Sequence, residues 1–104
     1  MLYKIKGIKH SGTLGERYSE RTDGQYQNRI GRTVDIDIDN IELDYPLIIH
    51  YVKDSDGTPI YTKYLRTSHV KDFNVINTLD GTAKYLTVET ENSIFEFERI
   101  YEDE

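Results

Sequence analysis

Five carboxylates lie close together in the sequence near the middle of the chain, and their spacing could allow them to bind a partner. They are Asp35, Asp37, Asp39, Glu42 and Asp44. The first three alternate with apolar residues, so a strand over residues 33–45 would place them on one face, about 7 Å apart. Such a row could imitate the spaced phosphates of a nucleic acid and occupy a basic site on a partner protein.

The same acidic face has a second interpretation that needs no partner. Charge on an exposed strand keeps it soluble and protects an edge from aggregation. A spacing of about 7 Å is too wide for two carboxylates to share one ion without ligands from another element. The sequence therefore predicts an acidic face without a metal ion.

A second set of side chains combines cations with aromatic rings in a glycine-rich segment, residues 10–32. Its members are Arg17, Tyr18, Arg21, Tyr26, Arg29 and Arg32. Such residues can follow a phosphate backbone and stack on bases, which makes nucleic-acid or nucleotide binding an alternative function. They could equally recognise an acidic partner, or form a solvated loop with a tyrosine packed on the fold. No glycine-rich phosphate-binding fingerprint accompanies them.

No catalytic or metal-binding motif is recognisable. The absence of cysteine excludes disulfides, thiolate metal sites and thiol nucleophiles. Three histidines, His10, His50 and His69, fall in separate segments, and we expect His50 to be packed or hydrogen-bonded within an apolar strand. The run 54–57 resembles the start of a calcium loop but lacks the later ligands, so it is typical of a hairpin turn. We expect a non-enzymatic protein without a cofactor or a metal ion.

Charge is divided unevenly along the 104 residues, whose formal net charge is −6. Residues 1–34 carry seven basic and three acidic side chains, a net +4, and residues 35–104 carry a net −10. This division favours one basic surface on an otherwise acidic protein. The overall sign argues against broad binding to nucleic acids or anionic membranes.

Composition points to a β-sheet protein. A single alanine, Ala83, stands against 27 β-branched residues and 12 aromatic ones, and these side chains pack well on a pleated surface. No repeated long amphipathic helices are present, so the sheet should be antiparallel. Alternation predicts strands over residues 3–9, 33–45, 47–53, 59–65, 68–76, 83–89 and 94–101.

The elements between these strands are also predicted by residue type. The alternation in 33–45 slips by one residue at Asn40, which predicts a β-bulge or bend there. Turns are expected at residues 54–57, 80–81 and 91–93. A short helical turn is expected near residues 15–20 of the glycine-rich segment.

Six to seven short strands in one small domain, residues 1–104, favour an SH3-like or OB-like antiparallel barrel with one long glycine-rich segment. No apolar run reaches the about 20 residues of a membrane span, and lysines interrupt the first residues where a signal peptide would be apolar. We expect a cytoplasmic protein. Exposed strand edges would allow a homodimer by sheet extension.

Part of the sequence resembles small uncharacterised proteins encoded by phages and low-GC bacteria. The resemblance rests on Leu65-Arg66-Thr67-Ser68-x-Val70, on Val88-x-Thr90-x-Asn92-Ser93-x-Phe95-x-Phe97 and on Gly31-Arg32-x-Val34. It covers the C-terminal third and one fragment, and it implies a short protein of a mobile element whose partner is a host or phage protein. It transfers no catalytic residue.

Overall fold

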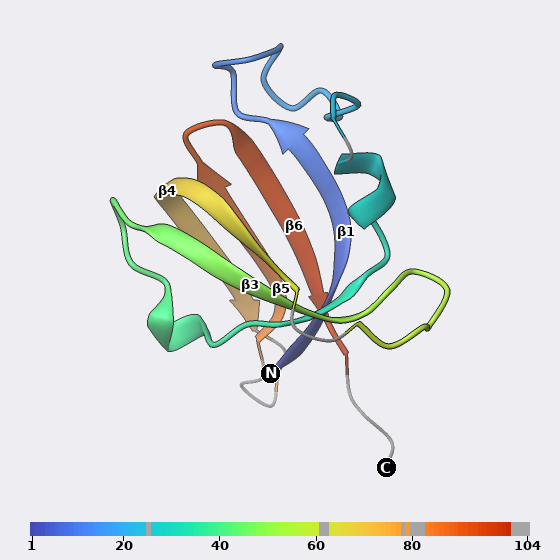
Figure 1. Cartoon of the computed structure of the whole chain (residues 1–104). Helices are drawn as coiled ribbons and strands as arrows, with labels where there is room; N and C mark the ends of the chain where they lie inside the picture. Colours follow the sequence, from blue (N-terminus) through green and yellow to red (C-terminus); the bar gives the residue numbers. More distant parts are fainter. Residues whose placement is uncertain (25, 61–62, 78, 80–82, 101–104) are drawn as a thin grey trace.

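A closed antiparallel barrel of six strands forms the structure, a computed structural model that describes residues 1–24, 26–60, 63–77, 79 and 83–100 (Figure 1). The strands are β1 (Leu2–His10), β2 (Thr33–Asp35), β3 (Pro46–Lys53), β4 (Tyr64–Asn77), β5 (Ala83–Thr90) and β6 (Ser93–Arg99). Each strand pairs with its neighbour in sequence, and β1 closes the barrel on β6. This confirms the prediction of an all-β chain that forms a small antiparallel barrel. No helix in the described residues is long and apolar enough to cross a membrane.

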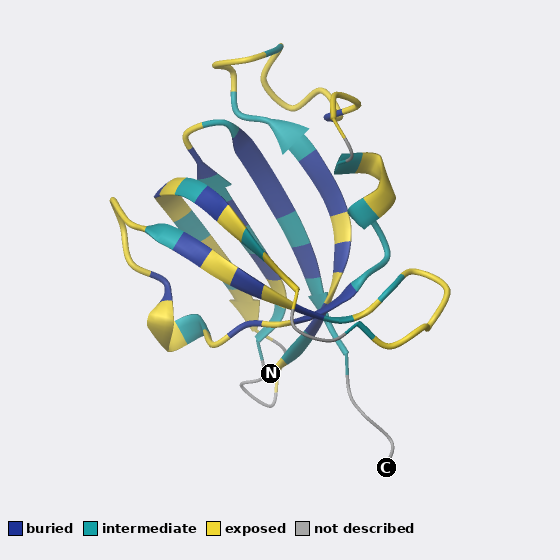
Figure 2. Cartoon of the chain, viewed as in Figure 1, coloured by how far each residue is buried: buried dark blue, intermediate teal, exposed yellow. Residues whose placement is uncertain are grey.

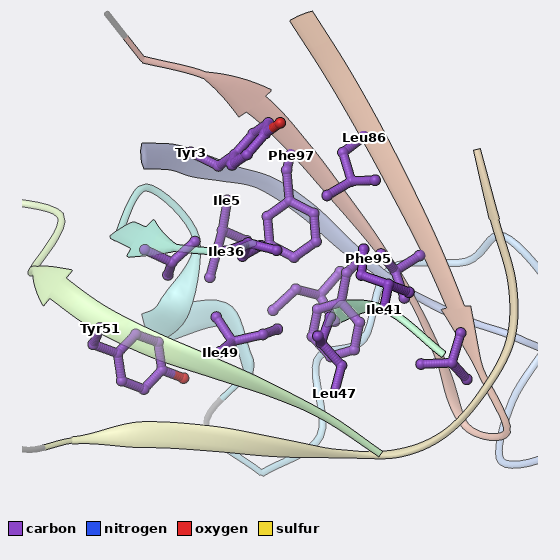
Figure 3. Close-up of a cluster of buried hydrophobic side chains, with 14 residues drawn as sticks. Tyr3, Ile5, Ile36, Ile41, Leu47, Ile49, Tyr51, Leu86, Phe95 and Phe97 are labelled. Carbon is purple, nitrogen blue, oxygen red and sulfur yellow. The ribbon is translucent and has the colours of Figure 1, made fainter. Parts of the chain in front are cut away.

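The core fills the inside of the barrel because buried and exposed side chains alternate along the strands (Figure 2). On β1, Tyr3 and Ile5 are buried while Lys4 and Lys6 face outward, as predicted. Apolar side chains from every strand meet in the interior, and Figure 3 shows the rings of Phe95 and Phe97 among them. The centroids of these two stacked rings lie 6.1 Å apart.

The predicted strand over residues 33–45 is wrong beyond Asp35, where β2 ends. The carboxylate of Asp37 accepts the backbone N–H of Asp39 at 3.1 Å, and a single 3-10 turn, η2 (Ile38–Asn40), follows. Aspartate side chains compete in this way for backbone groups that a sheet would otherwise pair. The slip in alternation at Asn40 therefore marks this turn. Val34 and Ile36, which precede it, are buried as an alternating pattern requires.

Strand β4 replaces two predicted strands, 59–65 and 68–76, with one strand of 14 residues. It pairs with β3 at its start and with β5 from Val70 onward, and a register shift lies between Val70 and Asp72. The polar residues predicted to separate two strands continue the sheet, because the buried hydroxyl of Thr67 accepts the N–H of Leu47 at 2.9 Å. Residues 61–62 of the predicted strand lie outside the described residues, and Pro59 makes only an isolated bridge to Lys53.

The glycine-rich segment contains short regular pieces. Residues 18–21 run antiparallel to the end of β1, where the N–H of Arg21 donates to the carbonyl of Ile8 at 2.9 Å. Its helical turn is η1 (Tyr26–Arg29), so the predicted position of that turn at residues 15–20 is wrong. The segment then rejoins β1 through the N–H of Gly31, which donates to the carbonyl of Ile5 at 2.8 Å.

The turns predicted between strands agree with the structure where those residues are described. At residues 54–57, the N–H of Gly57 donates to the carbonyl of Asp54 at 2.9 Å, and Gly57 adopts a φ of 89° that suits glycine. The tight turn at residues 91–93 joins β5 to β6. The turn predicted at 80–81 lies outside the described residues, as does the end of the strand predicted over 94–101.

Closure of the barrel bears on the predicted homodimer. Sheet extension needs an unpaired strand edge, and closing a sheet removes its edges. All six strands described here have a partner on both sides. The structure therefore gives no support to a dimer formed by sheet extension.

Two neighbouring residues of β3 test the assignment of the barrel interior. Ile49 is fully buried, whereas Ile48 beside it is 38% exposed. We expect Ile49→Ala to lower the free energy of unfolding by about 2–5 kcal/mol, because it leaves a cavity in the core. The matched change Ile48→Ala should cost less than about 1 kcal/mol. Urea unfolding of both variants checks this, and equal losses would contradict the assigned register of β3.

Candidate functional site

The five predicted carboxylates surround the connection between β2 and β3, which we call the acidic segment (residues 35–44). All five are exposed. Asp35 ends β2, Asp37 caps η2, Asp39 lies within it, and Glu42 and Asp44 precede β3. The predicted row along one strand face is therefore wrong, because the chain turns after Asp35. Of the five, Asp35 and Asp37 line one pocket, and the set follows a turn rather than the regular repeat of a strand face.

Contacts within the chain leave part of this negative charge free. The N-terminal ammonium lies 2.9 Å from Oδ1 of Asp35, and Nζ of Lys71 lies 3.7 Å from Oδ1 of Asp44. Asp39 and Glu42 have no ion-pair partner among the described residues. The acidic segment thus presents uncompensated carboxylates to solvent.

A surface pocket of about 310 Å³ adjoins the acidic segment. Its lining combines polar and apolar groups: Asp35, Asp37, Asn40, Pro46, Leu47, Ile48 and His50. Asp35 lies directly opposite His50 in the register of β2 with β3. Carboxylates beside aliphatic side chains suit a cation carried on an aliphatic stem, as in lysine or arginine.

His50 corrects one expectation and extends the predicted site. Its side chain is exposed on the outer face of β3, so the expected packing inside an apolar strand is wrong. Its ring centroid lies 6.1 Å from that of Tyr64 on β4. The alternation of β3 contained the signal for this position, since burying Leu47 and Ile49 must turn Ile48 and His50 outward.

The basic and aromatic residues of the glycine-rich segment are mostly engaged within the chain. Arg17 binds both carboxylate oxygens of Glu89, at 2.7 and 2.8 Å, and its guanidinium lies 4.7 Å from the ring centroid of Tyr18. These hydrogen bonds raise the pKa of Arg17 and lower the pKa of Glu89 from their usual values. The pair fastens the glycine-rich segment to β5.

Arg21 is a buried structural cation, only 3% exposed. Its guanidinium forms an ion pair with both oxygens of Asp23 and donates to the hydroxyl of Ser93 at 2.6 Å. The hydrogen bonds from Arg21 lower the pKa of Asp23 to about 2, and the same interaction raises the pKa of Arg21. Arg21 also lies 4.1 Å from the ring centroid of Tyr26.

Arg32 and Arg29 complete the predicted basic set. Arg32 lies 3.3 Å from Oδ1 of Asp54 and stacks over the ring of Tyr51. Arg29 lies 4.7 Å from the ring centroid of Tyr26 and has no ion-pair partner among the described residues. Three of the four arginines are thus already paired with carboxylates, and the set does not form one open basic groove.

A second, smaller pocket of about 190 Å³ lies where the glycine-rich segment meets β4 and β5. Arg17, Tyr18, Phe73 and Glu89 are among its lining residues. Tyr18 adopts a φ of 71°, a conformation that is uncommon outside glycine. Arg17 and Glu89 already bind each other, which leaves Asp72 as the other charged residue of its lining.

The three histidines do not meet. Nε2 of His10 lies 3.8 Å from Oδ1 of Asp23, Nδ1 of His69 lies 3.6 Å from Oε1 of Glu91, and His50 belongs to the first pocket. Across the described part of the chain, no group of three potential metal-ligating side chains is close enough to hold an ion.

Comparisons with known proteins supply no family for this chain. No protein-family model matches it, and neither a search of curated proteins nor a search of solved structures returns a significant match.

Acid titration tests the role of Asp23. Its pKa in the folded protein lies below the ordinary value, so the Arg21 ion pair stabilises the fold above pH 4 and loses that effect as pH falls toward 2. We expect Asp23→Asn to unfold at lower urea concentration than the wild type at pH 7, with the difference shrinking between pH 4 and pH 2. Asp39→Asn, at an exposed carboxylate without an ion pair, serves as control. A difference that is independent of pH would contradict the assignment.

Proposed function

We propose that this protein is a non-enzymatic binding module that docks a basic surface of another protein on its acidic segment. The observation that carries the proposal is the pocket that joins Asp35 and Asp37 to the aliphatic side chains of β3. A lysine or arginine of the partner would place its charged head at Asp37 and at Asp35, where it would compete with the N-terminal ammonium, and its methylene stem against Ile48.

The expected binding energies favour a surface on which ion pairs and apolar contacts both contribute. An exposed ion pair contributes only about 0.2–1 kcal/mol, so carboxylates alone would give weak binding. Burying apolar area adds about 25 cal/mol per Å². Pro46 and Ile48 supply such area beside the carboxylates, and the free charges of Asp39 and Glu42 would speed the encounter with a cationic partner.

Two finer expectations depend on this proposal. A phage or mobile-element origin, expected from the C-terminal resemblance, would make the partner a host or phage protein. Imitation of a nucleic acid is less well supported, because the carboxylates surround a turn and lack the regular spacing of phosphates along a strand.

The alternative function, nucleic-acid or nucleotide binding by the glycine-rich segment, stays a prediction. It has less support than the acidic surface, since Arg17, Arg21 and Arg32 are held by carboxylates of the same chain. A phosphate would have to compete with those ion pairs.

A lysine hexapeptide probes the proposed acidic surface. In two-dimensional amide NMR of the full chain, we expect its addition to shift the signals of residues 35–50 first. The shifts should weaken between about 50 and 200 mM salt, because exposed charges are screened. Shifts spread evenly over the barrel would contradict the proposal.

Paired variants localise the same effect. Asp35→Asn combined with Asp37→Asn should reduce the affinity for the hexapeptide by about three- to tenfold, which corresponds to two lost surface ion pairs. The control combines Asp56→Asn with Asp72→Asn, two exposed carboxylates outside the segment and with the same change in net charge. An equal loss in both proteins would show that the peptide responds to net charge alone.

Single-stranded oligonucleotides test the alternative. We expect no gel shift at about 50 mM salt, where phosphate contacts are strongest. A shift at that salt, lost on Arg29→Glu, would support the glycine-rich segment as the binding surface and contradict our preference for the acidic one.

A further inference from the structure

The outer face of β2, β3 and β4 presents two adjacent rows of exposed side chains beside the acidic segment. The register places Asp35 opposite His50, His50 opposite Tyr64, and Ile48 opposite Arg66. Directly opposed residues of antiparallel strands project from the same face. We call these five residues, Asp35, Ile48, His50, Tyr64 and Arg66, the outer strip.

Charge changes sign across the outer strip. Asp35 on β2 is negative, Ile48 on β3 is apolar, and Arg66 on β4 is positive. Arg66 is exposed and has no ion-pair partner among the described residues. Tyr64 beside it is 60% exposed. Tyrosine and arginine are the residue types that most often dominate the energy of protein interfaces.

We propose that the outer strip binds an extended segment of the partner in which a basic, an apolar and an acidic residue follow one another. This inference rests on the proposed function, since its basic position is the residue that enters the pocket at Asp35 and Asp37. The apolar position packs on Ile48 and Tyr64, and the acidic position pairs with Arg66.

The dimensions of the sheet set the spacing of that segment. Neighbouring strands lie about 4.8 Å apart, and Arg66 lies two residues along β4 from Tyr64, which is level with Asp35, so Asp35 and Arg66 are separated by about 12 Å. An extended chain advances about 3.3 Å per residue. The basic and acidic residues of the partner should therefore stand two to four positions apart, with the apolar residue between them.

The complementary pattern separates this strip from another exposed apolar pair on the barrel. Ile76 and Tyr85 are opposite each other on β4 and β5 and are also exposed. The neighbouring cation there, Lys84, is already paired with Glu98 at 3.4 Å. Together with Asp37 of the adjoining pocket, the outer strip combines apolar side chains with a carboxylate and an arginine that have no ion-pair partner among the described residues.

A displayed library of random nonapeptides, selected against the full-length protein, tests the inference. We expect enrichment of sequences with lysine or arginine, then an apolar residue, then aspartate or glutamate two to four positions after the basic one or, in the reverse chain direction, before it. An enriched peptide should bind Arg66→Glu about tenfold more weakly than the wild type. Arg29→Glu makes the same change in charge on η1 and should leave binding unchanged.

The outcomes separate the inference from the function on which it rests. Enrichment of basic residues without an acidic position, together with unchanged binding by Arg66→Glu, would overturn the inference and leave the acidic docking surface in place. Selection without a basic preference, or without any enrichment, would overturn both. Circular dichroism and urea unfolding confirm that each variant is folded before binding is measured.

Discussion

The pairing of β1 with its neighbours on both sides is the constraint on which the structure depends. On one side β1 follows β6 from Tyr3 to His10, and on the other it pairs with β2 at Leu2–Lys4. This closes the sheet, removes its edges and commits every strand to one inner and one outer face. Any surface that binds a partner must then be formed by outward-facing side chains of the strands and by the connections between strands.

Alternation along the sequence predicts which side chains are buried better than it predicts where strands end. Ile36 is buried as the pattern requires, although β2 has already ended at Asp35. The end is decided by one carboxylate, that of Asp37, which offers the backbone a local hydrogen bond. Thr67 has the opposite effect, because its hydroxyl satisfies a backbone N–H and lets β4 continue. Such choices depend on three-dimensional neighbours that periodicity does not contain.

The charge pattern of the sequence likewise does not predict which charged residues pair with each other in the fold. A net +4 over the first 34 residues predicts a basic surface, yet folding brings Glu89 and Asp54 from the acidic remainder to Arg17 and Arg32. The basic segment is thereby largely neutralised from within. Around the β2–β3 connection, Asp37, Asp39 and Glu42 have no ion-pair partner among the described residues. The sequence alone identifies these residues as an acidic cluster. The pocket that Asp35 and Asp37 share with His50 could not be predicted, because it depends on the pairing of β2 with β3.

The length of β4 has a consequence for how this chain can change. One strand supplies Thr67 and Val70 to the interior and Tyr64 and Arg66 to the exterior, and it pairs with β3 along its first part and with β5 from Val70 onward. Inserting or deleting a single residue within it would exchange inner and outer faces beyond that point. Substitutions can therefore vary the outer surface one side chain at a time, while length variation must be confined to the connections between strands.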